Sequence, residues 1–167
     1  VQPGVVKGVL DKELKKHNMF LPPDPASSNY CTVGGMVSNN SSGPHGLGYG
    51  SILRYLDHVD IIYSNGEEGF AENGICDSRL KKILSPLISI HDKLTSFYPD
   101  VSKNSCGYRL DSLFTPEFKP QNIFAASEGT LSIIDSLRFK ILDLPIFRSL
   151  FFVYFSDVLS ACLYIKK

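Results

Sequence analysis

A glycine-rich segment at residues 31–50 constrains this chain of 167 residues more than any other feature. It carries six glycines and five serines or asparagines. Such a segment buries little apolar surface, but its backbone can approach a ligand closely and turn N–H groups toward an anion. A loop that only turns the chain is the alternative. The apolar start, Cys31–Val37, and the prolines at 22, 23 and 25 that fix where the segment begins favour a ligand-binding loop.

Four sequence blocks, in the same order, resemble the second half of the FAD-binding domain in the vanillyl-alcohol-oxidase/PCMH family of FAD-linked oxidases. They are Val1–Val5 with Phe20–Pro25, Cys31–Gly43 with His45 and Tyr49-Gly50, Tyr98–Asp111, and Ser127–Leu131. Met36 and His45 resemble the D-lactate and D-2-hydroxyacid dehydrogenases fused to an iron–sulfur module, since the simpler glycolate-oxidase type usually has Asn and Arg there. The resemblance implies an α+β fold with a mixed or antiparallel sheet flanked by helices. Residues 1–144 would form the second FAD-binding subdomain, and 145–167 would start the cap domain.

FAD is the cofactor that this resemblance implies. The candidate FAD contacts are Pro25, Gly34, Gly35, Asn39, Asn40, Ser42, Gly43, Ser127, Glu128, Gly129, Thr130, Ile133 and Ile134. The loop residues would run past the isoalloxazine, ribityl and diphosphate groups, and the chain after the Ser127–Thr130 turn would pass the adenine. For each of these residues a purely structural turn is the alternative interpretation.

The resemblance also implies a substrate side, for which the candidates are His45, Lys103, Asn104 and Tyr108. A lysine there can attract a substrate carboxylate, and a packed turn with Tyr108 in the core is the alternative for Lys103, Asn104 and Tyr108. His45 is conceivable as a base or a flavin anchor, and a histidine that only hydrogen-bonds a loop is the alternative. The sequence assigns no catalytic residue and no metal ligand, because the other histidines lack metal-ligand spacing.

The function that the resemblance implies is the FAD-binding portion of an oxidoreductase that oxidises a 2-hydroxy acid, such as D-lactate or glycolate, by hydride transfer to FAD. In this family a base from the cap removes the hydroxyl proton. The first FAD subdomain with its diphosphate loop, most of the cap and an iron–sulfur cysteine pattern are not found in the sequence. A separate chain that carries them is therefore an expected partner. A non-catalytic remnant that no longer binds FAD is the alternative.

The composition and residue spacing of the sequence argue against several other kinds of protein. Lys+Arg and Asp+Glu are 17 each, so no charge excess points to nucleic acid. The four cysteines are far apart in the sequence, which argues against a zinc site and suits a cytoplasmic protein. Residues 146–165 are apolar, but Arg148 and Asp157 interrupt them, so a strand and a helix are expected rather than a membrane span. A dinucleotide fingerprint at Gly46-x-Gly48 fails because Ser51 replaces its third glycine.

Periodicity predicts the local elements. A helix spans Val6–Leu14 with Asn18 just past its end, and a strand spans Tyr55–Tyr63 before an Asn65-Gly66 hairpin turn. Asp77 caps a helix that Pro86 breaks or kinks, and a second helix spans Leu87–Phe97. The other expected elements are strands at Asn122–Ala126, Leu131–Leu142 and Leu150–Phe155 and a final helix from Asp157.

Overall fold

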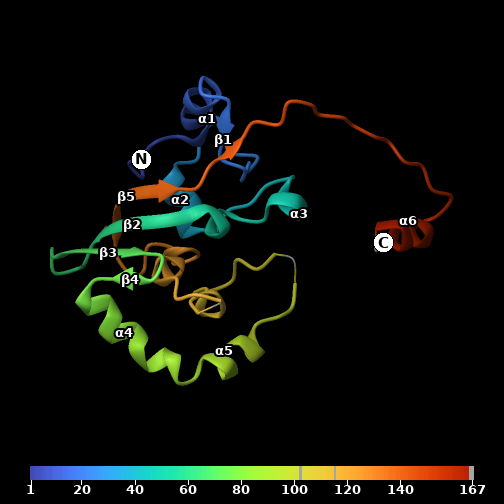
Figure 1. Ribbon diagram of the computed structural model, residues 1–167. Coiled ribbons are helices and arrows are strands. Elements are labelled where there is room, and N and C mark those ends of the chain that lie inside the picture. The colour runs from blue at the N-terminus through green and yellow to red at the C-terminus, as the bar shows by residue number, and fades with distance from the viewer. Residues whose placement is uncertain (102, 115, 166–167) are drawn as a thin grey trace.

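The computed structural model describes residues 1–101, 103–114 and 116–165, and it confirms the predicted α+β class (Figure 1). Its main sheet is antiparallel, with the strand order β4-β3-β2-β5. These strands are β2 (Leu56–Ile62), β3 (Glu68–Glu72), β4 (Ile75–Cys76) and β5 (Ile133–Phe139). A small second sheet pairs β1 (Met19–Phe20) with β6 (Leu142–Asp143).

The central strand β2 forms as predicted because its residues alternate between the core and the other face. Val59 and Ile61 are fully buried on one side, whereas His58 and Asp60 lie on the other. The expected hairpin follows, in which Gly66 has φ +83° and donates its N–H to Tyr63 O at 2.9 Å. β2 therefore pairs with β3 through this turn and with β5 through distant sequence.

The remaining elements of the described chain are helices and 3-10 turns. They are α1 (Lys7–Lys15), α2 (Val33–Ser38), α3 (Gly46–Tyr49), α4 (Ser78–Ile88), α5 (His91–Phe97) and α6 (Val158–Ile165), with 3-10 turns η1 (Ile52–Tyr55), η2 (Leu110–Ser112) and η3 (Pro120–Phe124). Asn18 takes the left-handed conformation predicted for a residue past the end of α1, with φ +56°. Asp77 caps α4 by accepting the N–H groups of Arg79 and Leu80. These two ends confirm that local signals set the helix boundaries.

Four predicted elements differ from the structure, and three of them lie before the arm that follows β6. The strand expected at Asn122–Ala126 is wrong, because η3 buries this run as a 3-10 turn that begins at Pro120. The strand expected over Leu131–Leu142 is split, since β5 pairs with β2 and β6 pairs with β1. The break expected at Pro86 falls later, after Ile88, so α5 begins only at His91.

The strand expected at Leu150–Phe155 is also wrong. Residues 145–157 form an extended arm that leaves the body after β6 and leads to α6, which stands apart (Figure 1). A strand needs a neighbour for its backbone hydrogen bonds, and no strand pairing is present for this arm within the described part of the chain. Its large apolar side chains are exposed, among them Phe147 at 88% and Tyr154 at 90%.

The exposed arm should make the chain associate, because contiguous apolar surface of this kind marks an interaction or aggregation site. We expect the full chain to self-associate at tens of micromolar and a chain ending at Leu144 to sediment as a monomer. The shortened chain should keep its stability to within about 0.5 kcal/mol, because the removed side chains are mostly exposed. Analytical ultracentrifugation and thermal melts of both forms check this. A monomeric full chain would contradict it.

Candidate functional site

The first turn of α2 places the glycine pair of the loop. Thr32 caps the helix, and its hydroxyl oxygen accepts the Gly35 N–H at 3.2 Å. The N–H groups of Val33 and Gly34 donate to Val5 O and Pro3 O, each at 2.9 Å. The backbone N–H groups at the start of α2 were expected to face an anion. They donate instead to acceptors within the chain.

The glycines of this loop have different surroundings. A Cβ on Gly34 would lie 2.6 Å from Pro3 Cβ, and a Cβ on Gly43 would overlap the backbone of Asp24. A Cβ on Gly35 would meet only Thr32 Oγ1, at 3.2 Å. Gly34 and Gly43 therefore let Pro3 and Asp24 lie close to the loop backbone. The space beside Gly35 is open except for the Thr32 hydroxyl.

Two polar candidates of the loop are engaged within the chain. Asn40 is fully buried with φ +45°, donates its amide to Asn104 O at 3.1 Å and accepts the Leu53 N–H at 3.3 Å. Asn39 donates its side-chain amide to Gly35 O at 3.0 Å. Asn40 consequently ties the glycine-rich loop to the turn that follows it and to Asn104, which lies 64 residues further along the chain.

A cavity of about 370 Å³ opens where the loop meets residues 101–109, and we call it the junction cavity. It is lined by Ser42, Gly43, Gly46, Leu47, Gly50, Ser51, Leu53, Arg54, Val101, Lys103, Asn104 and Arg109. Two candidate FAD contacts, Ser42 and Gly43, thereby meet two substrate-side candidates, Lys103 and Asn104. The N–H groups of Ser42 and Gly43 have no hydrogen-bond acceptor among the described residues.

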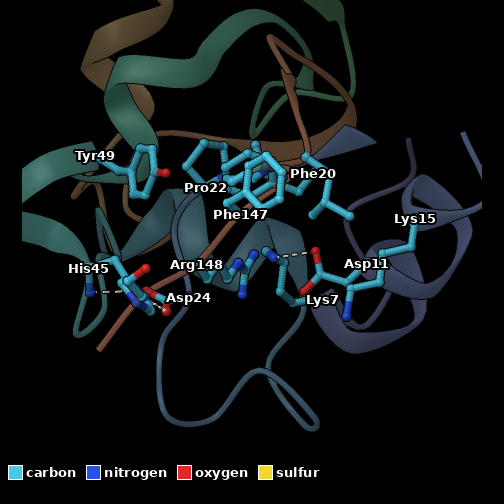
Figure 2. Close-up of a pocket in the computed structure, with 14 residues that line it drawn as sticks. Lys7, Asp11, Lys15, Phe20, Pro22, Asp24, His45, Tyr49, Phe147 and Arg148 are labelled. Carbon is cyan, nitrogen blue, oxygen red and sulfur yellow. Dashed lines mark hydrogen bonds and ion pairs between the residues drawn. The ribbon is translucent and has the colours of Figure 1, made fainter. Parts of the chain in front are cut away.

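A second cavity, of about 460 Å³, lies on α1 and β1, and we call it the aromatic cavity (Figure 2). Phe20 and Tyr49 meet there edge to face at 5.6 Å between ring centroids, and Phe147 and Arg148 of the arm close one side. His45 also lines it, with Nδ1 hydrogen-bonded to the Asp24 carboxylate. The substrate-side candidates are therefore divided, since His45 faces this cavity and Lys103 the other.

The last two sequence blocks meet outside both cavities. Tyr108 and Thr130 share a hydrogen bond between their hydroxyls at 2.7 Å. Glu128 donates its N–H to Ser38 O at 2.9 Å, so the turn that contains Gly129 packs on the end of α2. Ser127 is buried, whereas Ile133 on β5 is 68% exposed. Pro25 lines neither cavity, and its carbonyl accepts the Ser28 N–H in a turn. FAD contacts at these residues stay a prediction.

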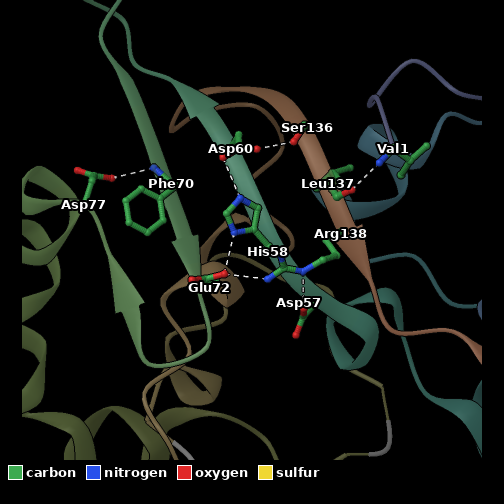
Figure 3. Close-up of polar contacts among 10 residues, drawn as sticks. All are labelled: Val1, Asp57, His58, Asp60, Phe70, Glu72, Asp77, Ser136, Leu137 and Arg138. Carbon is green, nitrogen blue, oxygen red and sulfur yellow. Dashed lines mark hydrogen bonds and ion pairs between the residues drawn. The ribbon is translucent and has the colours of Figure 1, made fainter.

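A charged network that the sequence did not predict covers the polar face of the sheet (Figure 3). The ring nitrogens of His58 lie 2.8 Å from Asp60 and 3.1 Å from Glu72. Arg138 of β5 bridges Glu72 at 2.8 Å and Asp57 at 2.6 Å. Alternation along β2 puts His58 and Asp60 on one face, but Glu72 comes from β3 and Arg138 from β5, so only strand pairing reveals the whole network.

Acid should weaken this network. A hydrogen bond from Ser136, together with His58, holds the pKa of Asp60 below its usual range, and Arg138 lowers the pKa of Glu72. A carboxyl whose pKa is lower when folded stabilises the protein above its unfolded pKa of about 4 and loses that contribution as the pH falls. We expect the free energy of unfolding in urea to fall as the pH drops from about 5 to about 2, and to fall less in Asp60→Asn. An equal fall in both proteins would contradict the role of Asp60.

Two site classes find no support in the described residues. No three His, Cys, Asp or Glu side chains gather there as a metal site. None of the helices that the structure describes has the length and apolar character needed to cross a bilayer.

Part of the chain matches a known protein family, and most of it is similar to curated proteins. Residues 1–68 match the family model described as FAD binding domain. The chain is 31% identical to a D-2-hydroxyglutarate dehydrogenase of Haemophilus influenzae over 90% of its length, and 28% identical to the glycolate oxidase subunit GlcD of Bacillus subtilis over 87%. A D-lactate dehydrogenase of Anaerostipes hadrus is 27% identical over 87% of the chain. The chain spans 16% of the first of these relatives and 23% of the other two.

A solved structure supports the fold. An alkyldihydroxyacetonephosphate synthase superposes with a TM-score of 0.52 over 87% of this chain and 21% of its own, at 20% sequence identity. Residues 1–68 therefore match part of an FAD-binding domain, and the chain shares the fold of this synthase and is related in sequence to D-2-hydroxyglutarate and D-lactate dehydrogenases and to the glycolate oxidase subunit GlcD.

Proposed function

We propose that this chain forms one wall of the FAD site in a flavin-dependent oxidoreductase that oxidises a 2-hydroxy acid. The observation that carries the proposal is the junction cavity, where Ser42 and Gly43 of the loop meet Lys103 and Asn104. The relatives named for D-2-hydroxyglutarate, D-lactate and glycolate support the substrate class.

The residues at this cavity fit parts of FAD that carry oxygen atoms. The free N–H groups of Ser42 and Gly43 and the cation of Lys103 are donors, which suits phosphate and hydroxyl oxygens. Gly35, whose side is open, would border the same cofactor. The N–H groups of Val33 and Gly34 have acceptors within the chain, so they would not take part. When bound, FAD accepts the substrate's hydride, and the protein's role is to hold and orient both molecules.

The proposed contact with the substrate rests on the positive charge of Lys103. Lys103 would attract the substrate carboxylate, with Asn104 beside it in the cavity lining, whereas Tyr108 lies outside this cavity. The chain offers no base for the hydroxyl proton at the junction cavity, because its described lining holds no His, Asp or Glu. We propose that the base, the first FAD subdomain and any iron–sulfur module come from further parts of the protein or from a partner chain.

The division of the chain into domains belongs to the same proposal. Residues 1–144 would be FAD-binding, and residues 145–167 would start the cap. The departure of the arm from the body after β6 supports a boundary there.

Titration with FAD tests the proposed function. We expect FAD absorbance and fluorescence to change on binding, and Ser42→Val to weaken the affinity about tenfold, because a hydroxyl and space beside it are both lost. Ser85→Val on exposed α4 is the matched control and should bind as the wild type does. A folded wild-type chain that ignores FAD would favour the rival function, a remnant that has lost the cofactor.

A further inference from the structure

A third cavity, of about 350 Å³, lies between β4, α4 and the two phenylalanines Phe114 and Phe118, and we call it the apolar cavity. Leu84 in its lining is almost fully buried, whereas Ile75 and Ile88 are exposed. A ligand that covers these two isoleucines removes apolar surface from water, which favours binding. None of the candidate FAD contacts or substrate-side residues lines this cavity, so it is separate from the site described above.

One wall of the apolar cavity is aromatic. The rings of Phe114 and Phe118 stack with centroids 5.4 Å apart and an interplanar angle of 16°. Contacts outside the cavity hold both rings, since His91 meets Phe114 edge to face at 5.1 Å and Phe118 O accepts the Gly74 N–H at 2.7 Å. A wall fixed in this way costs little entropy when a ligand binds against it. An aromatic ligand gains from contact with such rings beyond the area that it buries.

The apolar cavity carries one positive charge. Lys81 of α4 lines it and makes no ion pair with any residue that the structure describes. The described lining contains no aspartate or glutamate. Glu117, the residue before Phe118, lies outside the lining and accepts the Asn73 side-chain amide at 3.0 Å. The unmatched charge of Lys81 therefore favours a ligand with one anionic group.

The thiol of Cys76 adds no negative charge to this lining. Burial and the nearby Asp77 carboxylate raise the pKa of Cys76 and outweigh the opposite effect of Lys81, so the thiol stays protonated at neutral pH. Asp77 itself caps α4 and does not line the cavity. A neutral sulfur packs favourably against aromatic rings. The cavity therefore combines an apolar, partly aromatic interior with a single cation.

We propose that the apolar cavity binds a small aryl carboxylate, with its ring against Phe114 and Phe118 and its carboxylate at Lys81. The volume of about 350 Å³ gives room for a ring with a short side chain. An inorganic anion would leave Ile75 and Ile88 in water, and an alkyl carboxylate would lack the contacts between rings. This site uses no residue that the proposed function gives to FAD or to a 2-hydroxy acid, so it stands or falls separately.

Titration of the full chain with phenylpropionate tests the site, by ligand-observed NMR at a chain concentration low enough to limit self-association. We expect saturable binding. Phenylpropanol has the same ring without the charge and should bind about threefold to fivefold more weakly, because it loses an exposed ion pair. Octanoate has the charge without the ring and should be weaker by about the same factor. D-lactate, which has no apolar body, should not compete.

Two variants at the cavity remove one feature each. Lys81→Gln removes the charge, and Ile88→Gln replaces an exposed apolar side chain of the lining with an amide. Each should weaken the binding of phenylpropionate about threefold to fivefold. The matched controls are Lys82→Gln and Ile83→Gln, which make the same changes at exposed positions of α4 outside the lining. Both controls should bind as the wild type does, and thermal melts check that all four variants are folded.

Several results would overturn the proposal. The folded chain does not bind phenylpropionate, the controls lose as much affinity as the two cavity variants, or phenylpropanol or octanoate binds equally well. A chain that ignores phenylpropionate, and whose self-association is lost in Ile88→Gln but kept in Ile83→Gln, would identify a second copy as the occupant and also overturn it. FAD titrations of the same variants score the proposed function independently, because the cavity lies outside the proposed FAD site.

Discussion

Replacing Asp77 with alanine is expected to lower the free energy of unfolding by about 3 kcal/mol. Its carboxylate accepts the N–H groups of Arg79 and Leu80 at the start of α4, the Tyr63 hydroxyl at 2.8 Å and the Phe70 N–H at 3.2 Å. The alanine variant loses the helix cap and leaves the half-buried donors of Tyr63 and Phe70 without an acceptor. Urea unfolding of both proteins measures the difference.

The pH dependence of that difference identifies the carboxylate as the cause. Burial raises the pKa of Asp77, but hydrogen bonds from Leu80, Tyr63, Phe70 and Arg79 outweigh it, so the pKa lies below its usual range. A carboxyl of this kind stabilises the fold above its unfolded pKa of about 4 and ceases to do so as the pH falls. The gap between wild type and Asp77→Ala should therefore narrow toward about pH 2. Tyr63→Phe, which removes one donor only, should cost about 1 kcal/mol. A gap that does not change with pH would contradict this account.

Valine at Gly34 and valine at Gly35 should have opposite consequences, although the residues are neighbours. A Cβ at Gly34 would lie 2.6 Å from Pro3 Cβ and 3.1 Å from Pro3 O, and the backbone cannot yield without losing the Gly34–Pro3 hydrogen bond. We expect Gly34→Val to cost about 3 kcal/mol, as overpacking of a core does. Gly35→Val meets only Thr32 Oγ1 at 3.2 Å, so it should stay within about 1 kcal/mol of the wild type.

FAD affinity should change strongly in Gly35→Val, the variant whose stability changes least. The open side of Gly35 is where the loop would border the cofactor, so Gly35→Val should abolish FAD binding in a protein that is still folded. Thermal melts together with FAD fluorescence titrations measure both properties. An unchanged dissociation constant in folded Gly35→Val would remove this residue from the proposed FAD site and leave it a turn residue.

Sequence alone predicted the elements whose causes are local. The cap at Asp77, the left-handed residue Asn18, the Asn65-Gly66 turn and the alternation along β2 each depend on a few neighbouring residues, and the structure confirms all four. Where a partner decides the outcome, the sequence prediction failed. Leu150–Phe155 has the composition of a strand but pairs with no strand among the described residues, and Asn122–Ala126 is buried equally well in and after a 3-10 turn.

For the candidate site, too, some features could be predicted from the sequence and others depend on the tertiary structure. The glycine-rich loop was recognisable as a structured segment from its residues, and so was the resemblance to FAD-linked oxidases. Its surroundings were not, because they depend on segments that meet only after folding. Pro3 occupies the space beside Gly34, Asn40 joins the loop to Leu53 and Asn104, and Arg54 lines the junction cavity together with Lys103. The sequence determined which residues could bind an anion or a cofactor. The tertiary structure decided which of them are free to do so, since a donor already bound within the chain has no hydrogen left to offer a ligand.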